Sequence, residues 1–98
     1  MSKYFKLEIV TPDKTLFSGD VEIVVAPIMS DEEGFPKEEG FMANHIWICK
    51  LLDTGVIRLR EPGSKEHRLA NVSGGFIDFH GDALVFSDTA EWIAPSTN

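Results

Sequence analysis

Short apolar segments cut by turn signals run along the whole chain, and this pattern limits the folds that it can adopt. Residues 5–9 alternate apolar and charged side chains, as expected of a strand with one face in water. Further apolar segments occupy residues 21–25, 56–60, 67–72, 76–79 and 83–86. Turn-forming residues separate these segments at intervals of about ten residues, a spacing typical of sandwiches and barrels. The pattern therefore predicts an all-β fold.

The predicted architecture is a small antiparallel β-sandwich or flattened barrel of about eight to ten short strands. A length of 98 residues fits one domain. We assign this domain to residues 1–90 and expect residues 91–98 to form a short, frayed tail, because they show no helical periodicity. Turns are expected where Pro, Gly and Asp cluster, at residues 11–14, 61–64 and 80–82.

Several less regular features complete the expected layout. Glycine beside polar or other small residues predicts breaks between strands at residues 18–20, 53–55 and 74–75. Residues 30–40 are rich in Asp and Glu and are predicted to form a solvated acidic loop. Residues 41–52 favour a strand, because branched and aromatic side chains dominate their centre. Cys49 lies in this apolar segment and is predicted to be buried.

The net charge of -7 limits the partners of the chain. Nucleic-acid backbones and anionic membrane surfaces are bound by clustered Lys and Arg, which the sequence lacks. No apolar segment reaches the roughly 18–20 residues that a membrane-spanning helix needs. Residues 1–6 do not lead into the apolar core of a signal peptide. We therefore expect no nucleic-acid partner and no direct membrane insertion.

No pattern of reactive residues predicts a cofactor, a metal site or a catalytic residue. His45, His67 and His80 do not pair at a recurring metal-ligand spacing, and Cys49 stands alone. The acidic residues do not match an EF-hand loop, which needs glycine and glutamate at fixed positions. Neither a phosphate-binding glycine motif nor a nucleophile elbow is present in the sequence.

One short motif matches an enzyme class. Asp53, Thr54 and Gly55 form the Asp-Thr-Gly sequence with which aspartic proteases hold two carboxylates that share one proton. A retroviral protease is similarly short and all-β, and residues 74–77 resemble its flap. The motif lies mid-chain here, however, and the expected downstream apolar-apolar-Gly segment is missing. A dimeric aspartic protease therefore stays an alternative to the simpler interpretation, which is a plain turn.

A stronger resemblance rests on several motifs that occur in order. They occupy residues 7–14, 17–27, 52–59, 72–77 and 86–91. The most specific pair is Val-Ser-Gly-Gly-Phe-Ile followed, after a hairpin, by Phe-Ser-Asp-Thr-Ala-Glu. In this order and spacing the sequence resembles the N-terminal β-sandwich domain of the epsilon subunit of F-type ATP synthases. The resemblance also accounts for the Asp-Thr-Gly without catalysis.

The sequence departs from this family in its centre and at its end. Residues 40–47 keep the glycine and histidine of the family's central motif, but Ala43 and Trp47 replace its two prolines. Family members usually continue after the last motif into two antiparallel helices that bind nucleotide or inhibit hydrolysis. The sequence stops at Asn98, so we expect it to perform neither role in that way. These departures keep open a third hypothesis, a free-standing epsilon-like binding module.

The resemblance implies a non-catalytic subunit of the central stalk, or rotor, of a proton- or sodium-translocating ATP synthase. Its implied partners are the gamma subunit and the polar loops of the membrane c-ring, whose rotation it would couple to ATP synthesis or hydrolysis. The implied location is peripheral, at the cytoplasmic face of the bacterial inner membrane. By position in the motif, the residues expected to contact these partners are Glu38, Glu39, Asn44 and His45.

Each of these residues also has an ordinary interpretation. Glu38 and Glu39 would be solvated loop glutamates, Asn44 a turn residue and His45 a packed histidine. The sequence leaves both interpretations open.

Overall fold

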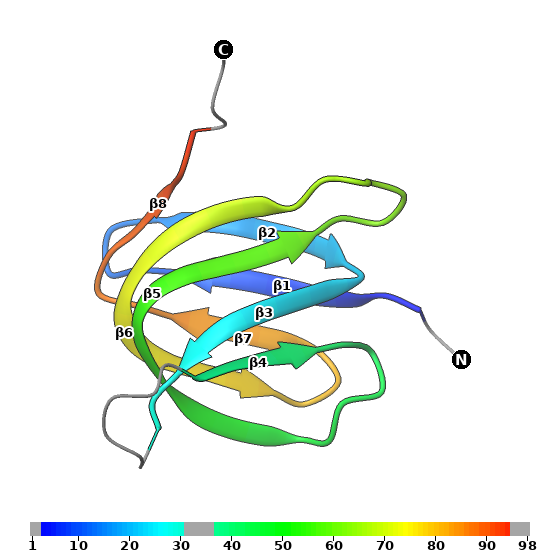
Figure 1. Ribbon diagram of the computed structural model, residues 1–98, viewed down its shortest axis with the longest axis horizontal. Coiled ribbons are helices and arrows are strands. Elements are labelled where there is room, and N and C mark those ends of the chain that lie inside the picture. Colours follow the sequence, from blue (N-terminus) through cyan, green and yellow to red (C-terminus); the bar gives the residue numbers. More distant parts are fainter. Residues whose placement is uncertain (1–2, 31–36, 95–98) are drawn as a thin grey trace.

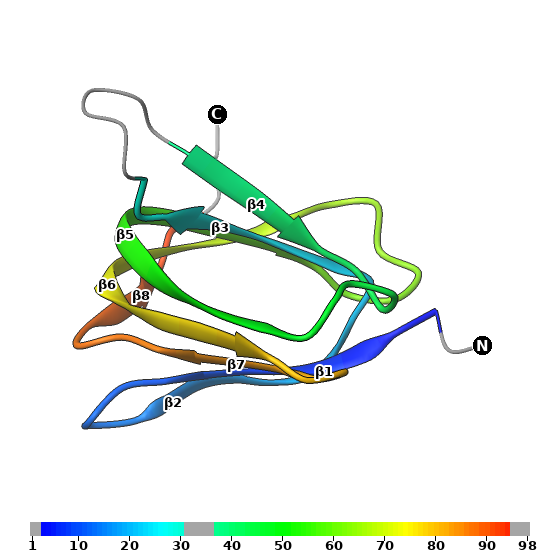
Figure 2. The ribbon, with the colours of Figure 1, turned by 90° about the horizontal axis from the view of Figure 1, so that it is seen from below.

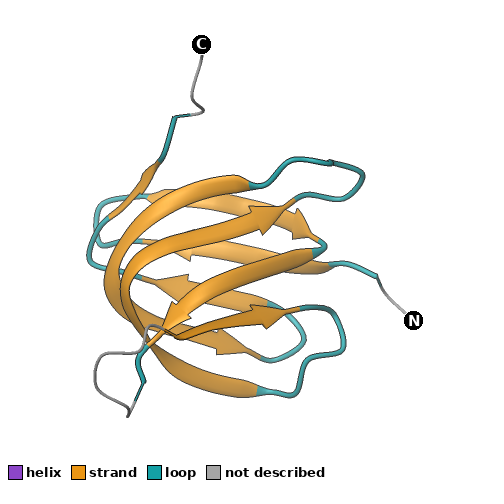
Figure 3. Cartoon of the chain, viewed as in Figure 1, coloured by secondary structure: helices purple, strands orange, loops and turns teal. Residues whose placement is uncertain are grey.

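The computed structural model describes residues 3–30 and 37–94, and every regular element in these residues is a strand (Figure 3). None of them forms a helix that could cross a membrane. The all-β prediction is therefore confirmed. The strands are β1 (Phe5–Val10), β2 (Thr15–Val21), β3 (Ile23–Ile28), β4 (Lys37–Phe41), β5 (Ile48–Arg60), β6 (Arg68–Phe79), β7 (Ala83–Phe86) and β8 (Ala90–Trp92).

One hydrogen-bonded sheet folds over to form the sandwich. Its strand order is β2-β1-β7-β6-β5-β3-β4, and β8 pairs with β6 beside this path (Figure 1). Figure 2 shows β3 and β4 in one layer and β1, β2 and β7 in the other. The long strands β5 and β6 bend and pass from one layer to the other. The two layers are thus joined through continuous backbone as well as through packing.

Strand direction differs from the prediction at one pair. β1 and β7 are parallel, with Leu7 opposite Ala83 and Val10 opposite Phe86, whereas the other pairs in the described residues are antiparallel. The consecutive pairs β1–β2, β3–β4, β5–β6 and β6–β7 form hairpins, which impose antiparallel pairing. β1 and β7 are far apart in the chain, so no hairpin fixes their relative direction.

The core lies between the two layers and takes alternate side chains from each strand. In β1, Phe5, Leu7 and Ile9 are buried while Lys6 is exposed, which confirms the alternation seen in the sequence. The rings of Phe41 and Phe79 stack, with their centroids 5.8 Å apart. The other buried apolar residues are Phe17, Val21, Val24, Ala26, Ile28, Leu52, Ile57, Leu59, Ala70, Val72, Ile77, Ala83, Val85 and Ala90.

The predicted turns at residues 11–14, 61–64 and 80–82 are present, each closed by a backbone hydrogen bond. The predicted breaks at residues 18–20, 53–55 and 74–75 are wrong, because these residues lie inside β2, β5 and β6. Leu52 pairs with Gly75 and Thr54 with Ser73, so the ladder continues across the positions expected to form turns. Glycine here allows a strand to bend without ending it.

Gly75 of β6 lies directly against the backbone at the end of β7. Its φ angle is +113°, and a Cβ atom at this position would lie 1.8 Å from the carbonyl oxygen of Phe86. Phe86 is paired with Phe76 across the ladder, so its backbone cannot withdraw without breaking the sheet. Only glycine fits both the conformation and the space.

The hydroxyl groups of Ser73 and Ser87 form hydrogen bonds just after the end of β7, close to Gly75. Ser87 is fully buried, and its Oγ accepts a hydrogen bond from the Ser73 backbone at 3.0 Å and donates to the Thr89 carbonyl at 2.9 Å. The Thr89 backbone N–H in turn donates to Ser73 Oγ at 3.0 Å. Polar groups buried in this way need partners. The two most specific sequence motifs, residues 72–77 and 86–91, are therefore hydrogen-bonded to each other, and we call this contact the junction.

The ordered structure continues beyond the domain boundary predicted at residue 90. β8 pairs Ala90 with Val72 and Trp92 with Ala70, and the Trp92 ring contacts the edge of Phe17. The guanidinium of Arg68 lies 3.9 Å from the centre of the Trp92 ring, close enough for a cation–π interaction. The last part of the predicted tail, residues 95–98, lies outside the described residues.

Two further expectations change in the centre of the chain. The predicted acidic loop is partly a strand, since β4 begins at Lys37, while residues 31–36 lie outside the described residues. Cys49 is exposed and not buried. Side chains alternate along β5, so Ile48 packs against the core and its neighbour Cys49 faces outward.

We expect Gly75→Ala to destabilise the fold by at least about 4 kcal/mol, because the added methyl group meets fixed backbone. The matched control is Gly63→Ala. Gly63 also has a positive φ angle, +77°, but nothing lies within 4 Å of an added Cβ atom. It should lose only about 1–2 kcal/mol, the cost of the left-handed conformation. Urea denaturation followed by circular dichroism measures both; equal losses would contradict the close approach.

Candidate functional site

The four residues singled out in the sequence lie on edge strand β4 and the loop that follows it. In the described residues β4 pairs only with β3, so its other side has no neighbouring strand. Residues 42–47 then connect β4 to β5. The structure therefore places Glu38, Glu39, Asn44 and His45 along one edge of one layer, but it turns their side chains in different directions.

Glu39 is at the centre of a half-buried ionic cluster. Its Oε2 lies 2.8 Å from His45 Nε2, and its Oε1 accepts a hydrogen bond from Lys50 Nζ at 2.5 Å. The exposed fractions of the three side chains are only 20%, 18% and 27%, in the order Glu39, His45 and Lys50. One carboxylate thus joins the edge strand, the loop and the start of β5.

The two basic neighbours favour the ionised form of Glu39. Burial alone raises the pKa of this carboxyl group, but the hydrogen bond and charge of Lys50, followed by those of His45, outweigh burial. The net pKa of Glu39 lies below its ordinary value of 4.5. Glu39 therefore acts as a fixed negative charge inside the cluster at neutral pH.

His45 is held on all sides. Its Nδ1 lies 2.7 Å from the carbonyl oxygen of Ile46, and its backbone N–H donates to the Met42 carbonyl at 2.9 Å. The imidazole ring packs on Phe41, with centroids 4.4 Å apart, and meets the edge of Phe79. This histidine is a packed residue that shapes the loop, as one of the two interpretations predicted.

Glu38 and Asn44 are the exposed members of the predicted set. The Glu38 side chain is 53% exposed and forms only a long contact, 3.4 Å, between its Oε1 and Arg58 Nη2. Asn44 is exposed in the loop after β4. Of the four predicted contact residues, these two are exposed, whereas Glu39 and His45 contact each other.

The sequence analysis did not predict that the apolar side chains of this region would be exposed. Met42, Ile46 and Trp47 are 56%, 71% and 71% exposed, and all lie in residues 42–47, which we call the apolar loop. The Trp47 ring rests near the His80 ring, with centroids 5.3 Å apart. Trp47 stands where the family has a proline, and this departure could have indicated an unusual loop. The apolar residues around it favoured a strand over residues 41–52 instead.

Comparison with known proteins identifies the family. The family model of the ATP synthase delta/epsilon chain beta-sandwich domain matches residues 4–93. The chain belongs to this family. The match includes every strand described above and the junction at Ser73, Gly75 and Ser87.

Bacterial epsilon chains show similar sequences. The ATP synthase epsilon chain of Brevibacillus brevis is 38% identical over 92 residues, which cover 93% of this chain and 64% of the relative. That of Dichelobacter nodosus is 40% identical over 91 residues, covering 92% of this chain and 59% of the relative. The chain thus spans less than two thirds of the length of these relatives.

Solved structures share the fold. A chain in the Euglena gracilis mitochondrial ATP synthase, in a structure of OSCP, F1 and c-ring, superimposes with a TM-score of 0.79 at 19% identity. This match covers 94% of the present chain and 55% of the other. A chain of the Tetrahymena thermophila mitochondrial enzyme, in a structure of the central stalk and c-ring, gives 0.66 at 13% identity, with 92% and 66% covered.

The Asp-Thr-Gly motif lies within strand β5 and not in the turn expected of a protease. Asp53 is exposed within β5, and its Oδ1 accepts a hydrogen bond from the Thr54 backbone at 2.8 Å. Thr54 and Gly55 pair with Ser73 and Val72 of β6. In this epsilon-family domain the motif is part of the bend that carries β5 between the two layers.

We expect Glu39→Gln to lower the free energy of unfolding by about 1–2 kcal/mol at pH 7, since it removes a charged hydrogen-bond acceptor. The folded pKa of Glu39 is below the unfolded one, so its contribution is present above about pH 4.5 and is lost as pH falls through the folded value. The gap between variant and wild type should therefore close in acid. Urea unfolding from pH 7 to pH 3.5 measures it.

Glu38→Gln is the matched control. Its ion pair is long and exposed, so the free energy of unfolding should change by less than about 1 kcal/mol. A gap for Glu39→Gln that stays constant down to pH 3.5 would contradict the role of its charge.

Proposed function

We propose that this domain is part of the central stalk of an F-type ATP synthase, where it links the gamma subunit to the c-ring and has no active site of its own. The observation that carries the proposal is membership of the delta/epsilon family over residues 4–93. The similar chains from Euglena and Tetrahymena were solved in assemblies that contain the c-ring. In this role the domain is peripheral, at the cytoplasmic face of a bacterial inner membrane, and couples rotation to ATP synthesis or hydrolysis driven by protons or sodium ions.

A body that transmits torque has to resist bending and slipping. β5 and β6 run continuously through both layers and pair along most of their length, from Ile48 opposite Phe79 to Leu59 opposite Arg68 (Figure 1). The junction at Ser87 ties β6, β7 and β8 together. Close packing between the layers makes such a body stiff, which supports a mechanical role.

The exposed residues around β4 suggest how the two contacts are divided. Stable interfaces combine a dry apolar centre with a polar rim. The apolar loop offers Met42, Ile46 and Trp47 for the dry contact, which we assign to the gamma subunit. Glu38 is exposed near the start of β4, and we assign it to the polar loops of the c-ring. Asn44 lies in the same loop and belongs to the rim.

Co-expression with the gamma subunit of the same genome tests the role. The two chains should elute together from size-exclusion chromatography as a one-to-one complex. A chain that elutes alone and folded would support the free-standing binding module instead.

We expect Trp47→Ala to weaken gamma binding at least tenfold, because a large exposed aromatic side chain is a typical interface hot spot. Leu51→Ala is the control, since Leu51 is 62% exposed but lies outside the apolar loop. Biolayer interferometry measures both affinities. Equal losses from the two variants would show that the apolar loop is not the principal contact.

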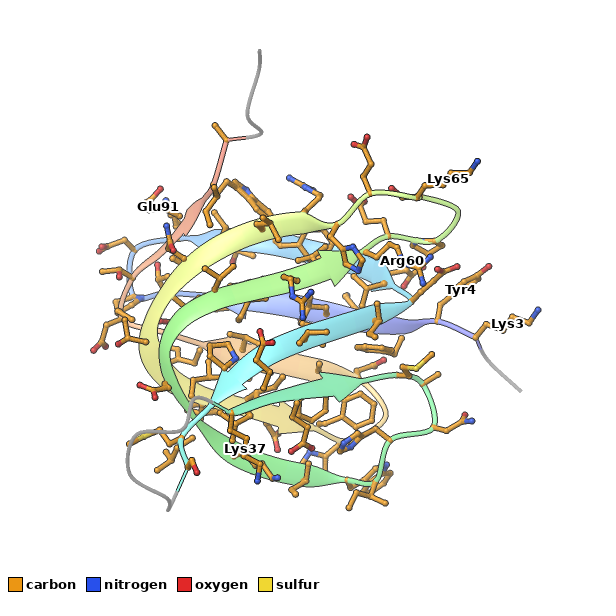
Figure 4. All side chains as sticks on the ribbon, viewed as in Figure 1. Lys3, Tyr4, Lys37, Arg60, Lys65 and Glu91 are labelled. Atoms are coloured by element: carbon orange, nitrogen blue, oxygen red, sulfur yellow. The ribbon has the colours of Figure 1, made fainter. Side chains whose placement is uncertain are left out.

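We expect Glu38→Lys to reduce ATP-driven ion pumping in reconstituted enzyme several-fold while leaving the melting temperature of the domain unchanged. The reversed charge should repel or misplace the polar ring loops, whereas the fold loses only an exposed ion pair. Glu66→Lys serves as the control, because Glu66 is exposed in the turn after β5. In Figure 4 the neighbouring Lys65 lies at the opposite end of the molecule from Lys37 of β4. Unchanged pumping by Glu38→Lys would contradict the assignment.

A further inference from the structure

Strand β8 is a small addition to the edge of β6. It has three residues, and in the described part of the chain it pairs only with β6 (Figure 1). Of its three side chains only that of Ala90 is buried, whereas Glu91 is exposed and Trp92 is half-buried. β6 also pairs with β5 along most of its length, and this pairing does not involve β8. β6 would therefore keep its place in the sandwich if β8 moved away.

The backbone of β6 uses alternate residues to bind β8. The Ile93 N–H donates to the Leu69 carbonyl at 2.8 Å, and the Ser73 N–H donates to the Thr89 carbonyl at 3.3 Å. Successive residues of a strand turn their N–H and C=O groups to opposite sides. Asn71 lies midway between Leu69 and Ser73, so its backbone groups also face β8.

The residues between these positions turn toward β5. Ala70 lies opposite Ile57, and Val72 lies opposite Gly55, in the ladder of β5 and β6. If β8 moved away, the N–H of Asn71 would lose its partner and meet water, while the N–H of Ala70 would stay bonded to β5. Neighbouring amides of one strand thus report on two different events, the departure of β8 and the unfolding of the sandwich.

A stacked guanidinium holds the end of β8 to the sandwich. The central carbon of the Arg68 guanidinium lies 3.9 Å from the centre of the Trp92 ring, and the same ring packs edge-on with Phe17. Arg68 Nη1 lies 3.3 Å from Glu61 Oε1, which helps to orient the guanidinium. Trp92 belongs to β8, whereas its partners belong to the body of the sandwich. The cation–π contact is therefore present only while β8 is in place.

The junction anchors the chain immediately before β8. Ser87 is fully buried there, and its Oγ accepts a hydrogen bond from the Ser73 N–H at 3.0 Å. The segment after the junction has a further tie, the ion pair between Glu91 and Lys14. This pair is exposed, and exposed ion pairs contribute little to stability. A movement of β8 would thus begin at Ala90 and leave the junction closed.

We propose that residues 90–94 form a detachable strap, which opens about the junction while the rest of the sandwich stays folded, and which the stacking of Arg68 on Trp92 holds closed. Local opening of this kind is expected where few apolar side chains are buried. When the strap is open, the backbone groups of Leu69 and Asn71 form a free strand edge with which another strand can pair. The inference goes beyond the function proposed above and does not depend on it, since the strap contains none of the residues assigned to the gamma subunit or the c-ring.

Native-state hydrogen exchange, followed by NMR on the isolated chain, tests the strap. The amides of Asn71 and Ile93 should exchange through strap opening, whereas those of Ala70 and Val72 should require unfolding of the sandwich. The protection factors of the first pair should therefore be at least about tenfold lower than those of the second. Equal protection of Asn71 and Ala70 would overturn the proposal, because β8 would then leave only when the whole sandwich unfolds.

Arg68→Gln tests what holds the strap closed. It removes the cation–π contact from the closed strap alone, so the protection factors of Asn71 and Ile93 should fall about two- to fivefold. Arg58→Gln is the matched control, because Arg58 forms a similarly exposed ion pair, with Glu38, but lies on β5. A change there affects the closed and open strap equally, so Asn71 and Ile93 should keep their protection. No fall in Arg68→Gln, or an equal fall in Arg58→Gln, would refute the role of Arg68.

Discussion

The sandwich depends on how closely β6 and β7 approach each other at Gly75. A side chain there would overlap the Phe86 backbone, so the approach exists only with glycine. It brings Ser73 and Ser87 within hydrogen-bonding distance and lets the latter close the turn into β8. These hydrogen bonds hold the middle of β6 to the segment between β7 and β8. β5 pairs with β6, so its position depends on that of β6. The apolar loop leads into the start of β5 and is positioned by the same pairing.

Much of the fold could be predicted, because it follows from local patterns. Alternation in residues 5–9 and turns with Pro, Gly and Asp are properties of neighbouring residues, and the structure confirms them. The glycine-containing breaks were mispredicted for a physical reason. The same Gly-Gly can end a strand or bend it, and the choice depends on the strand that pairs with it from elsewhere in the chain. Strand β4 was missed because only Phe41 of its five residues is buried, which leaves no alternation to detect.

The sequence could select candidate site residues but could not give the orientation of their side chains. Motif position selected Glu38, Glu39, Asn44 and His45, which the structure places on β4 and in the loop that follows it. Whether Glu39 faces a partner or the interior depends on Lys50, which lies 11 residues further along and reaches it only in the fold. Cys49 shows the same limit: a shift of one residue in the alternation of β5 decides whether a side chain is buried. Orientation therefore required the register of the sheet, which a single sequence does not contain.

The chemistry of β4 explains how an exposed edge and an exposed apolar loop can coexist. An unpaired edge strand can recruit another strand and aggregate, and charged side chains along it oppose such pairing. Here Lys37 and Glu38 line the edge, so a second copy of β4 would meet like charges in several registers. Met42, Ile46 and Trp47 lie in the loop beyond the end of the strand, outside the β3–β4 ladder. A partner therefore has to match the shape of residues 42–47, and this shape is set by the contacts of His45.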